Sequence, residues 1–549
     1  MPLRLTFALC CALWLTGSAV AQAHFLWLVS KADDANPTAA VYFSENASPD
    51  DPDLLDRVLK AEAFALAGRR GEAQPLKLAK SGDALVAELA PEQREAPIIL
   101  RHTYGAMTRG GDSFLLKYYA KTYPTALPGS WRAVKDGELL PLEVVPVLKS
   151  EGVDLKVLWQ GEPLAGATVT VEGPGIDKKL EGTTGEGGIF SCNLPEAGMY
   201  SIRAKHSEDK AGDFAGTAYK SIRHYSTLSL RHVPPQLQSV PNNWPALTKG
   251  VTSFGGAVVG DSLYVYGGHY GTAHEYYHED QSGDFYRLNL RDPQQWETLP
   301  GGPKLTGLAL VPHGGKLYRV GGFTAKNAQS ESESLWSQSD FARFDPAVGQ
   351  WETLPALPEG RSSHDAAVVG NTLYVVGGWL MAGGEEKRWH DTALSVDLSA
   401  RSLEWKVIPQ PPFHRRAVAL AGWNDKLFVI GGMQEKGGPT TAIAVFDPAS
   451  GKWSEGPALQ GTGMDGFGSS AFACGGRLFA TTMSGSIQRL SASGDQWEFV
   501  GQLAHPRFFH RLLPWHDDRL VVVGGASMVT GKTKSLELIP VAPVQAAAR

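Results

Sequence analysis

The feature that most constrains this chain is a short apolar strand that ends in a pair of glycines and recurs along its second half. Complete copies are LYVYGG, LYRVGG, LYVVGG, LFVIGG and LVVVGG, with first glycines Gly267, Gly321, Gly377, Gly431 and Gly524. A degenerate copy, LFATTMSG, spans Leu478 to Gly485. Six copies of one unit at a near-constant spacing are typical of a repeat architecture.

A tryptophan follows each of the first five copies after one more strand and turn. These residues are Trp296, Trp351, Trp405, Trp453 and Trp497. We predict that each unit is a four-stranded sheet whose tryptophan strand packs against the neighbouring unit. Because such a sheet cannot bury both its faces alone, six units must close into a ring. The segment around Trp244 precedes the first unit and is expected to supply the outer strand of the last one.

These glycine pairs and spaced tryptophans resemble the kelch repeat, which implies a six-bladed kelch-type β-propeller over residues 242–540. The chain also carries 62 glycines and 35 prolines but only 20% charged residues. This composition favours short strands joined by tight turns. The predicted fold class is therefore all-β, with one or two small β-sandwich-like domains before the propeller.

The first 23 residues have the pattern of a signal peptide. Arg4 precedes an apolar run from Leu5 to Leu15, and Ala21-Gln22-Ala23 is a small-x-small cleavage site. The pattern predicts cleavage after Ala23, a mature chain beginning at His24, and a periplasmic or secreted location. No later apolar stretch approaches the roughly 20 residues that a transmembrane helix needs. A net charge of −6 without a basic block argues against nucleic-acid binding.

Residues 24–233 show shorter strands with a different pattern. We predict a β-rich domain over 24–141, a β-sandwich over 142–233, a linker over 234–241 and a disordered tail over 541–549. The segments GEPLAGATVTVEGPG and TTGEGGIFSCNLPEAGMYSIRAKH resemble carboxypeptidase-regulatory-like modules. HFLWL, RHTYG, LLKYYAKTYP and RHYSTL resemble a secreted family associated with nickel uptake, and this resemblance implies metal binding.

His24 is the first candidate metal ligand, since a mature N-terminus there would carry an α-amine beside an imidazole. Nitrogen ligands of this kind suit Cu(II) and Ni(II), so we predict a copper or nickel site. His102 is the preferred further ligand, His206 and His224 are weaker candidates, and Glu45 would supply an oxygen. The alternative is that His24 merely follows the cleavage site and His102 is an ordinary half-buried histidine.

The loops after the second strand of each propeller unit are expected to share one face with the segments that lead into the first strands. Loops on a rigid scaffold commonly carry binding residues. This face is predicted to bind a glycan or a protein partner through His269, His274, His278, Arg361, His364, His414, Arg415, Arg507 and His510. The alternative is that the Arg-x-x-His segments only shape the lead into the first strand.

Two enzymatic interpretations compete with this non-catalytic one. A kelch propeller also resembles galactose oxidase, but Cys474 is expected on the face opposite the loops, which argues against a Cys–Tyr copper radical site. A family of sialic-acid mutarotases is also six-bladed, and an isomerase needs little more than an acid–base pair. The favoured function is an exported binding protein without catalysis, and the alternative is a carbohydrate-active kelch enzyme.

Overall fold

A computed structural model describes residues 24–32, 36–67, 71–134, 137–149 and 152–541. The predicted signal peptide and residues 542–549 of the predicted tail lie outside these ranges. Val541, which the tail prediction included, is buried and donates its N–H to the Asp518 carbonyl, so it is part of the fold. Within the described ranges no helix has the length and apolar character needed to cross a membrane.

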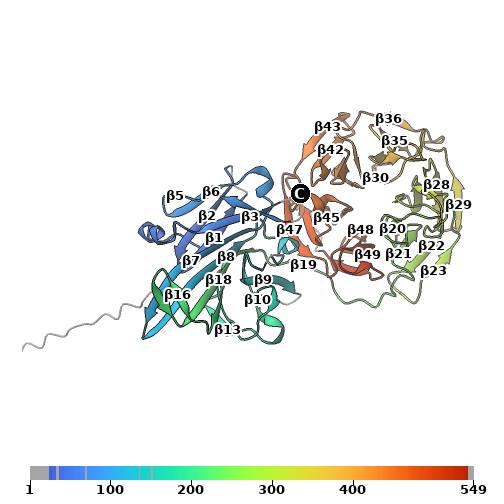
Figure 1. Ribbon diagram of the computed structural model, residues 1–549. Helices are drawn as coiled ribbons and strands as arrows, with labels where there is room; N and C mark the ends of the chain where they lie inside the picture. The colour runs from blue at the N-terminus through green and yellow to red at the C-terminus, as the bar shows by residue number, and fades with distance from the viewer. Residues whose placement is uncertain (1–23, 33–35, 68–70, 135–136, 150–151, 542–549) are drawn as a thin grey trace, which may run out of the picture.

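The N-terminal region is built on one eight-stranded sheet, with smaller sheets against each face (Figure 1). In spatial order the large sheet contains β13 (Leu180–Thr183), β12 (Thr168–Glu172), β15 (Gly198–Glu208), β18 (Ser221–His232), β8 (Asp112–Thr122), β7 (Ile98–Arg109), β3 (Glu62–Ala67) and β4 (Glu72–Leu76). On one face packs a sheet of β1 (Phe25–Lys31), β2 (Thr38–Ser44), β6 (Ala84–Glu88) and β5 (Ala79–Ser81). On the other face packs a sheet of β9 (Leu142–Lys149), β10 (Gly152–Trp159), β11 (Glu162–Pro163) and β14 (Ile189–Cys192).

The predicted boundary between residues 141 and 142 does not separate two independent sheets. Strand β18 pairs in parallel with β8, in the register Tyr225 to Tyr118, and so joins the two predicted domains into one eight-stranded sheet. Alternation along β18 gives each face its own core: Tyr225 packs with the β1 layer, whereas Leu228 and Leu230 pack with the β9–β10 layer. One 3-10 helix, η1 (Pro52–Val58), follows β2.

The propeller has the six blades that the repeats predict, arranged in a ring (Figure 1). Blade 1 contains β20 (Gly255–Val259), β21 (Ser262–Tyr266), β22 (Phe285–Asn289) and β23 (Glu297–Leu299). Blade 2 contains β24 (Ala309–His313), β25 (Lys316–Val320), β28 (Phe341–Asp345) and β29 (Gln350–Thr353). Blade 3 contains β30 (Asp365–Val369), β31 (Thr372–Val376), β35 (Ala393–Asp397) and β36 (Lys406–Ile408). Blade 4 contains β38 (Ala419–Trp423), β39 (Lys426–Ile430), β42 (Ile443–Asp447) and β43 (Lys452–Gly456). Blade 5 contains β44 (Ser470–Cys474), β45 (Arg477–Thr481), β46 (Ser486–Leu490) and β47 (Trp497–Gln502). Blade 6 contains β48 (Phe508–Trp515), β49 (Arg519–Ser527), β50 (Gly531–Lys532) and β51 (Glu537–Pro540).

The repeated tryptophans join adjacent blades. The indole N–H of Trp351 donates to the Pro300 carbonyl at 2.8 Å, and Trp453 makes the equivalent bond to Pro409 at 2.7 Å. In each case the acceptor is a proline carbonyl just beyond the outer strand of the preceding blade. The tryptophan therefore contributes both apolar area and a hydrogen bond to the contact between blades.

The glycine pairs are required where one blade meets the next. The N–H of Gly268 donates to the Leu305 carbonyl, in the segment that leads into blade 2, at 2.8 Å. The φ of Gly268 is +97°, and a Cβ there would lie 2.5 Å from a methyl of Val251. Both the positive φ and this close approach exclude larger residues.

The segment predicted to be a linker is part of the ring. Strand β19 (Leu237–Gln238) adds to the outer strand of blade 5 by parallel pairing with β47. Val240 then pairs with Leu538 of blade 6. The chain upstream of blade 1 therefore closes the last blade as predicted, but the pairing residue is Val240 and not one in the segment around Trp244. The Trp244 ring lies 5.7 Å from that of Trp515 in blade 6.

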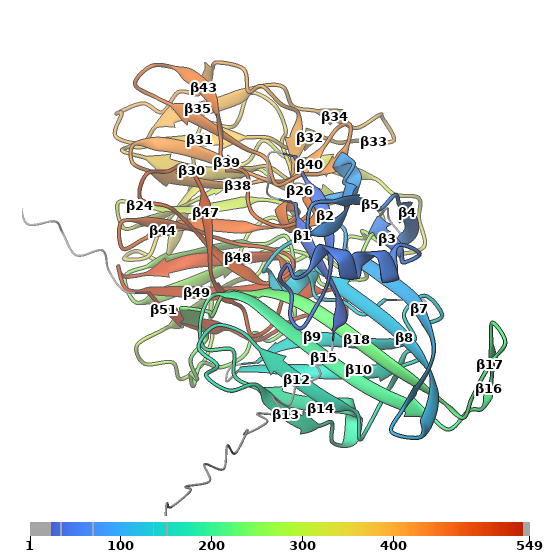
Figure 2. The same ribbon diagram turned by 90° about the vertical axis from the view of Figure 1, so that its left-hand side faces the viewer.

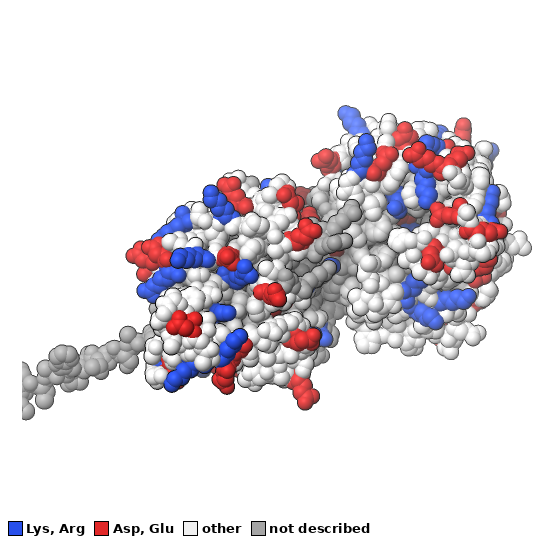
Figure 3. All heavy atoms as spheres, viewed as in Figure 1, with Lys and Arg blue, Asp and Glu red and all other residues white. Residues whose placement is uncertain are grey.

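The loops after the second strands gather on one side of the propeller, here called the loop face. Three short sheets form there. The first contains β26 (Phe323–Ala325), β27 (Leu335–Ser337) and β33 (Ala382–Gly383), and the second contains β32 (Trp379–Leu380) and β34 (Arg388–Trp389). The third contains β37 (Arg415–Arg416), β40 (Met433–Gln434) and β41 (Gly438–Pro439). In Figure 2 the labelled strands β32, β33 and β34 lie toward the right of the propeller, above strands β4 and β5 of the N-terminal region. Figure 3 shows acidic and basic side chains interspersed over one view of both regions.

The N-terminal region contacts the loop face at blade 5. Gly129 packs so closely on Ser484 that an added Cβ would lie 2.1 Å from the serine Cβ. Nearby, Glu95 has its pKa raised by burial and by the Asp465 charge, against the opposing effect of the Gly463 backbone. Blade 5 is therefore partly covered on its loop face.

Candidate functional site

Three arginines predicted to face a ligand instead hold the backbone of their own blades. Arg361, Arg415 and Arg507 are 2%, 8% and 1% exposed. Each donates through Nη1 to the carbonyl of the first glycine in the pair that follows it: Gly377 at 3.0 Å, Gly431 at 3.5 Å and Gly524 at 3.1 Å. We call them the clamp arginines. Their guanidinium groups are occupied within the fold, so the prediction that they contact a ligand is corrected.

His364 and His510, which follow two of the clamp arginines by three residues, are also buried. Both ring nitrogens of His364 lack a hydrogen-bond partner, whereas His510 Nε2 lies 2.6 Å from the Thr481 hydroxyl. Burial, reinforced by neighbouring arginines, lowers the pKa of His510 to about 3 and that of His364 well below its usual value. Both rings are therefore neutral parts of the core rather than surface ligands.

The centre of the ring is closed just below the loop face. Arg511 Nη1 on β48 lies 3.0 Å from Asp365 Oδ1 on β30, which belongs to the opposite blade. Above this ion pair, backbone bonds run around the axis between residues of positive φ, such as Ser363 N–H to the Gly307 carbonyl and Ala417 N–H to the Ser363 carbonyl. A ligand would therefore meet a closed axis rather than an open channel.

The histidine-rich loop of blade 1 divides into buried and exposed parts. His269 is 3% exposed, and its Nδ1 lies 3.4 Å from the Lys532 ammonium of blade 6. Burial and the Lys532 charge lower the pKa of His269 to about 4. His274 and His278 are exposed. The structure thus does not gather the three predicted histidines into one site.

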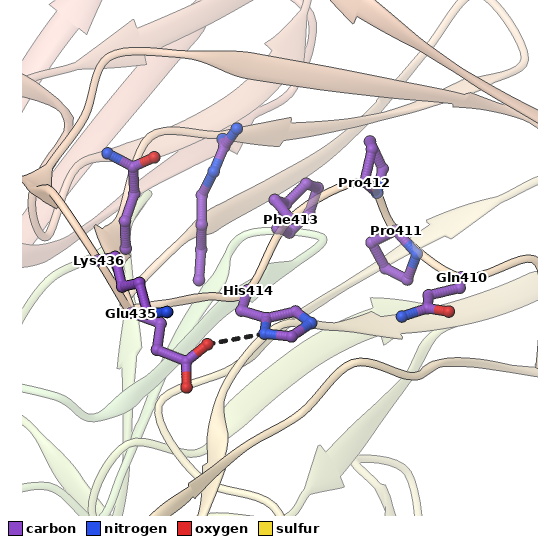
Figure 4. Close-up of a pocket in the computed structure, with 9 residues that line it drawn as sticks. Gln410, Pro411, Pro412, Phe413, His414, Glu435 and Lys436 are labelled. Carbon is purple, nitrogen blue, oxygen red and sulfur yellow. Dashed lines mark hydrogen bonds and ion pairs between the residues drawn. The ribbon is translucent and has the colours of Figure 1, made fainter.

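The predicted residue His414 lines a shallow, open depression of about 670 Å³ between blades 3 and 4 (Figure 4). Its Nδ1 lies 2.8 Å from Glu435 Oε2. Pro411, Pro412 and Phe413 form an apolar wall, while the side chains of Gln410, Gln434 and Lys436 supply polar groups. Of the residues predicted for the loop face, His414 is exposed in a concave surface.

A second group on the loop face was missed at the sequence level. The Arg416 guanidinium carbon lies 4.2 Å from the Trp379 ring centroid and 5.6 Å from that of Trp389. The two indoles are 5.8 Å apart at 64°. Tyr276 from blade 1 packs beside Trp379 in the same apolar cluster. The sequence did contain a signal for this group. Blade 4 has Arg416 after the clamp arginine Arg415, whereas blade 3 has Ser362 after Arg361, so Arg416 is an additional arginine.

The candidate metal ligands lie on two sides of the large sheet. His206 and His224 face each other across β15 and β18 with ring centroids 6.1 Å apart, on the face that packs against β10. His24 and His102 belong to the opposite face, where His24 Nε2 lies 3.3 Å from Asp50. Within the described ranges, no three His, Cys, Asp or Glu side chains form a metal-binding cluster. The predicted joint site with His206 or His224 is therefore not assembled.

Cys474 occupies the turn between the first two strands of blade 5, on the side away from the loop face. Its thiol is buried and lies 3.4 Å from the Arg519 carbonyl. Burial raises the pKa of this thiol to about 11. The placement agrees with the expectation that this cysteine is remote from the loop-face side chains.

Comparison with protein families identifies two segments. Residues 307–525 match the KLHDC2/KLHL20/DRC7 Kelch-repeats domain, and residues 21–208 match a domain of unknown function, DUF4198. The first match confirms the predicted kelch repeats. The specific relationship to a nickel-uptake family is not confirmed.

The curated relatives are covered over only part of their own length. Kelch-like protein terF of Aspergillus terreus is 26% identical over 290 residues, covering 50% of this chain and 61% of its own. An N-acetylneuraminate epimerase of Pasteurella multocida is 26% identical, covering 39% and 61%. One from Haemophilus influenzae is 33% identical over 141 residues, covering 25% and 33%. The chain thus spans less than two thirds of each of these relatives. The solved structure "Structure of YjhT" aligns at 18% identity with a TM-score of 0.43, covering 54% of this chain and 96% of that one.

Proposed function

We propose that this chain is an exported, non-catalytic binding protein whose propeller presents the loop face to a glycan. The single observation that carries the proposal is the pairing of a closed axis with partly exposed aromatic rings around it. The backbone of Trp379 pairs with Ser362, three residues before Asp365, and the side chains of Trp379, Trp389 and Tyr276 are each partly exposed. Rings of this kind offer large, rigid, apolar contact area with a polar edge.

The chemistry of the buried histidines supports binding over catalysis. A general acid or base acts best when its pKa lies near the working pH and its side chain reaches the substrate. His364 and His510 meet neither condition, since burial lowers the pKa of both and leaves each about 4% exposed or less. A protein partner for the loop face is the other form of the binding proposal, supported by the relatives that are named kelch-like proteins.

The proposal is tested by screening the protein beginning at His24 against an immobilised glycan array. A hit is then titrated by calorimetry against the wild type and against Trp379→Ala. We expect at least a ten-fold loss of affinity in the variant. The matched control is Trp405→Ala, which precedes the outer strand β36 of blade 3 and should bind as the wild type does once folding is verified. Equal binding by Trp379→Ala would contradict the proposed site.

The alternative is a carbohydrate-active enzyme of the isomerase type, and one observation favours it. Two relatives are named N-acetylneuraminate epimerase, and the exposed His414–Glu435 pair supplies a hydrogen-bonded acid and base in a depression. Exchange spectroscopy of N-acetylneuraminate anomers with catalytic amounts of protein tests it. Accelerated exchange that disappears in His414→Ala would favour the enzyme. Exchange at the rate of buffer would favour binding alone.

A metal role for the N-terminal region is a separate proposal and rests on His24. His206 and His224 lie on the other face of the sheet and cannot join His24 in one site. His24 itself lies at the rim of an aromatic cluster, with its ring centroid 5.7 Å from that of Phe43 and its Nε2 3.3 Å from Asp50. Cleavage after Ala23 would add an α-amine beside this imidazole. Two nitrogens and a carboxylate are donors that copper or nickel accepts.

A further inference from the structure

The side chain of Arg416 differs from that of the neighbouring clamp arginine Arg415 in having no hydrogen-bond or ion-pair partner among the described residues. Arg415 donates through its guanidinium to the Ala442 carbonyl at 2.7 Å. The backbone of Arg416 pairs with Met433, but its guanidinium has only ring contacts, and its Nε is buried without a hydrogen-bond partner. Guanidinium groups removed from water normally find carboxylates or carbonyls, because an uncompensated charge is costly there.

The surroundings of Arg416 hold the cation without neutralising it. Trp379 and Trp389 present their ring faces to the guanidinium, and such contacts orient an arginine while leaving its N–H groups free. Burial lowers the pKa of Arg416, and the opposing influence comes from the Tyr276 phenol rather than from a carboxylate. The guanidinium is therefore held in place with its charge unmatched.

Other cations lie near this group. Lys326 lies 4.0 Å over the Trp336 ring, and strand β27, which carries Trp336, pairs with β33 beside β32. Lys387 lies 5.4 Å over Trp379 and pairs with Glu333 at 3.2 Å. Glu333 is therefore paired with Lys387 rather than with Arg416.

We infer that Arg416 is an anion-recognition subsite on the loop face, which binds a carboxylate, sulfate or phosphate group of the bound molecule. The inference rests on the proposed glycan binding and deepens it: the molecule would stack a ring on the tryptophans and place its anionic group against Arg416. A planar guanidinium suits a two-pronged bond to such oxygens. The Tyr276 hydroxyl, for which no hydrogen bond is seen among the described residues, lies on the same side and offers a further donor.

The test uses two sugar probes with the same sugar backbone, a galacturonate tetramer and its methyl ester, in which methylation removes the negative charges. Inorganic sulfate is a probe that lacks a sugar. Binding to the protein beginning at His24 is followed by tryptophan fluorescence and calorimetry at constant ionic strength. We expect the acid tetramer to bind at least ten-fold more tightly than the ester. Arg416→Gln should abolish that preference and the response to sulfate, while Arg416→Lys should keep part of both. Arg343→Gln, which removes a partly exposed arginine of blade 2 that pairs with Glu352, is the matched control.

The outcomes separate the inference from the function on which it rests. An unchanged acid preference in Arg416→Gln, in a protein whose thermal melt matches the wild type, would overturn the subsite. Equal binding of acid and ester by the wild type would overturn it too and leave glycan binding standing. A sulfate response that depends on Arg416, with neither tetramer bound, would support the subsite and count against glycan binding. No response to sulfate or to the acid tetramer would overturn the subsite.

Discussion

Arg511 and Asp365 meet across the axis of the propeller, 3.0 Å apart, from the innermost strands of blades 6 and 3. The arginine also donates to the Phe254 and Leu308 carbonyls, which lead into blades 1 and 2. The aspartate accepts from the Leu420 N–H of blade 4 at 2.9 Å. One ion pair therefore connects five blades at the point where the ring is narrowest.

Removing one partner of this pair should destabilise the propeller. Asp365→Ala leaves a guanidinium without its counter-charge and Leu420 N–H without its acceptor, since the two side chains are 22% and 7% exposed. We expect a loss of about 2 to 3 kcal/mol, less than for a fully buried pair because Arg511 is partly solvated. Urea denaturation measures it. Arg287→Ala, which breaks a more exposed pair with Glu297, should cost less than about 1 kcal/mol and is the control. Equal losses would show that the axial position carries no special weight.

The upstream segment that closes blade 6 should be essential to ring stability. Trp244→Ala removes the contact with Trp515 and the 3.0 Å bond from the indole to the Leu290 carbonyl. We expect about 2 to 4 kcal/mol of destabilisation, since the side chain is partly buried. Thermal melting and protease resistance would reveal it. Val348→Ala, at a position 65% exposed, should leave both unchanged. A wild-type melt for Trp244→Ala would contradict closure through this segment.

Acid should destabilise the propeller through His510. Burial lowers its pKa to about 3 in the folded chain, against roughly 6.5 when unfolded. Between those values the unfolded chain binds a proton that the folded chain does not, so this contribution is complete above about pH 6.5 and is lost as the pH falls. Because one bound proton changes the free energy of unfolding by about 1.4 kcal/mol per pH unit, His510 should lower it by about 2 kcal/mol between pH 6.5 and pH 5.

The comparison is between His510→Gln and wild type, each denatured with urea at pH 7.5 and pH 5. The variant should be less stable at pH 7.5, but its loss between the two pH values should be about 2 kcal/mol smaller. His274→Asn, at an exposed histidine whose φ of +68° an asparagine accepts, serves as the control. An identical pH dependence in His510→Gln and wild type would show that another group is responsible.

The His24 proposal predicts a metal content that depends on the true N-terminus. Protein beginning at His24 should retain copper or nickel after desalting, and His24→Ala should retain at least ten-fold less. His102→Ala should match the wild type if His24 and its α-amine act without it. Elemental analysis of the three preparations decides the matter, and equal metal in the first two removes the chelate.

The repeats alone determined the ring. A sheet with two apolar faces has to be covered by copies of itself, and the evenly spaced glycine pairs indicate where the copies touch. The physical reason is seen at Gly267, where an added Cβ would lie 2.8 Å from the carbonyl oxygen of Leu305, in the segment that leads into blade 2. The same local reasoning identified the clamp segments, since Arg361 and its equivalents follow the repeat.

Tertiary structure decided which side chains are free. Arg415 and Arg416 are adjacent and chemically identical, yet alternation along β37 directs one to a glycine carbonyl and leaves the other against two indoles. Alternation along β18 likewise placed His224 on the face of the sheet away from His24. Contacts between distant segments, such as Gly129 on Ser484 or Arg511 with Asp365, depend on how whole sheets pack, and no local pattern encodes them.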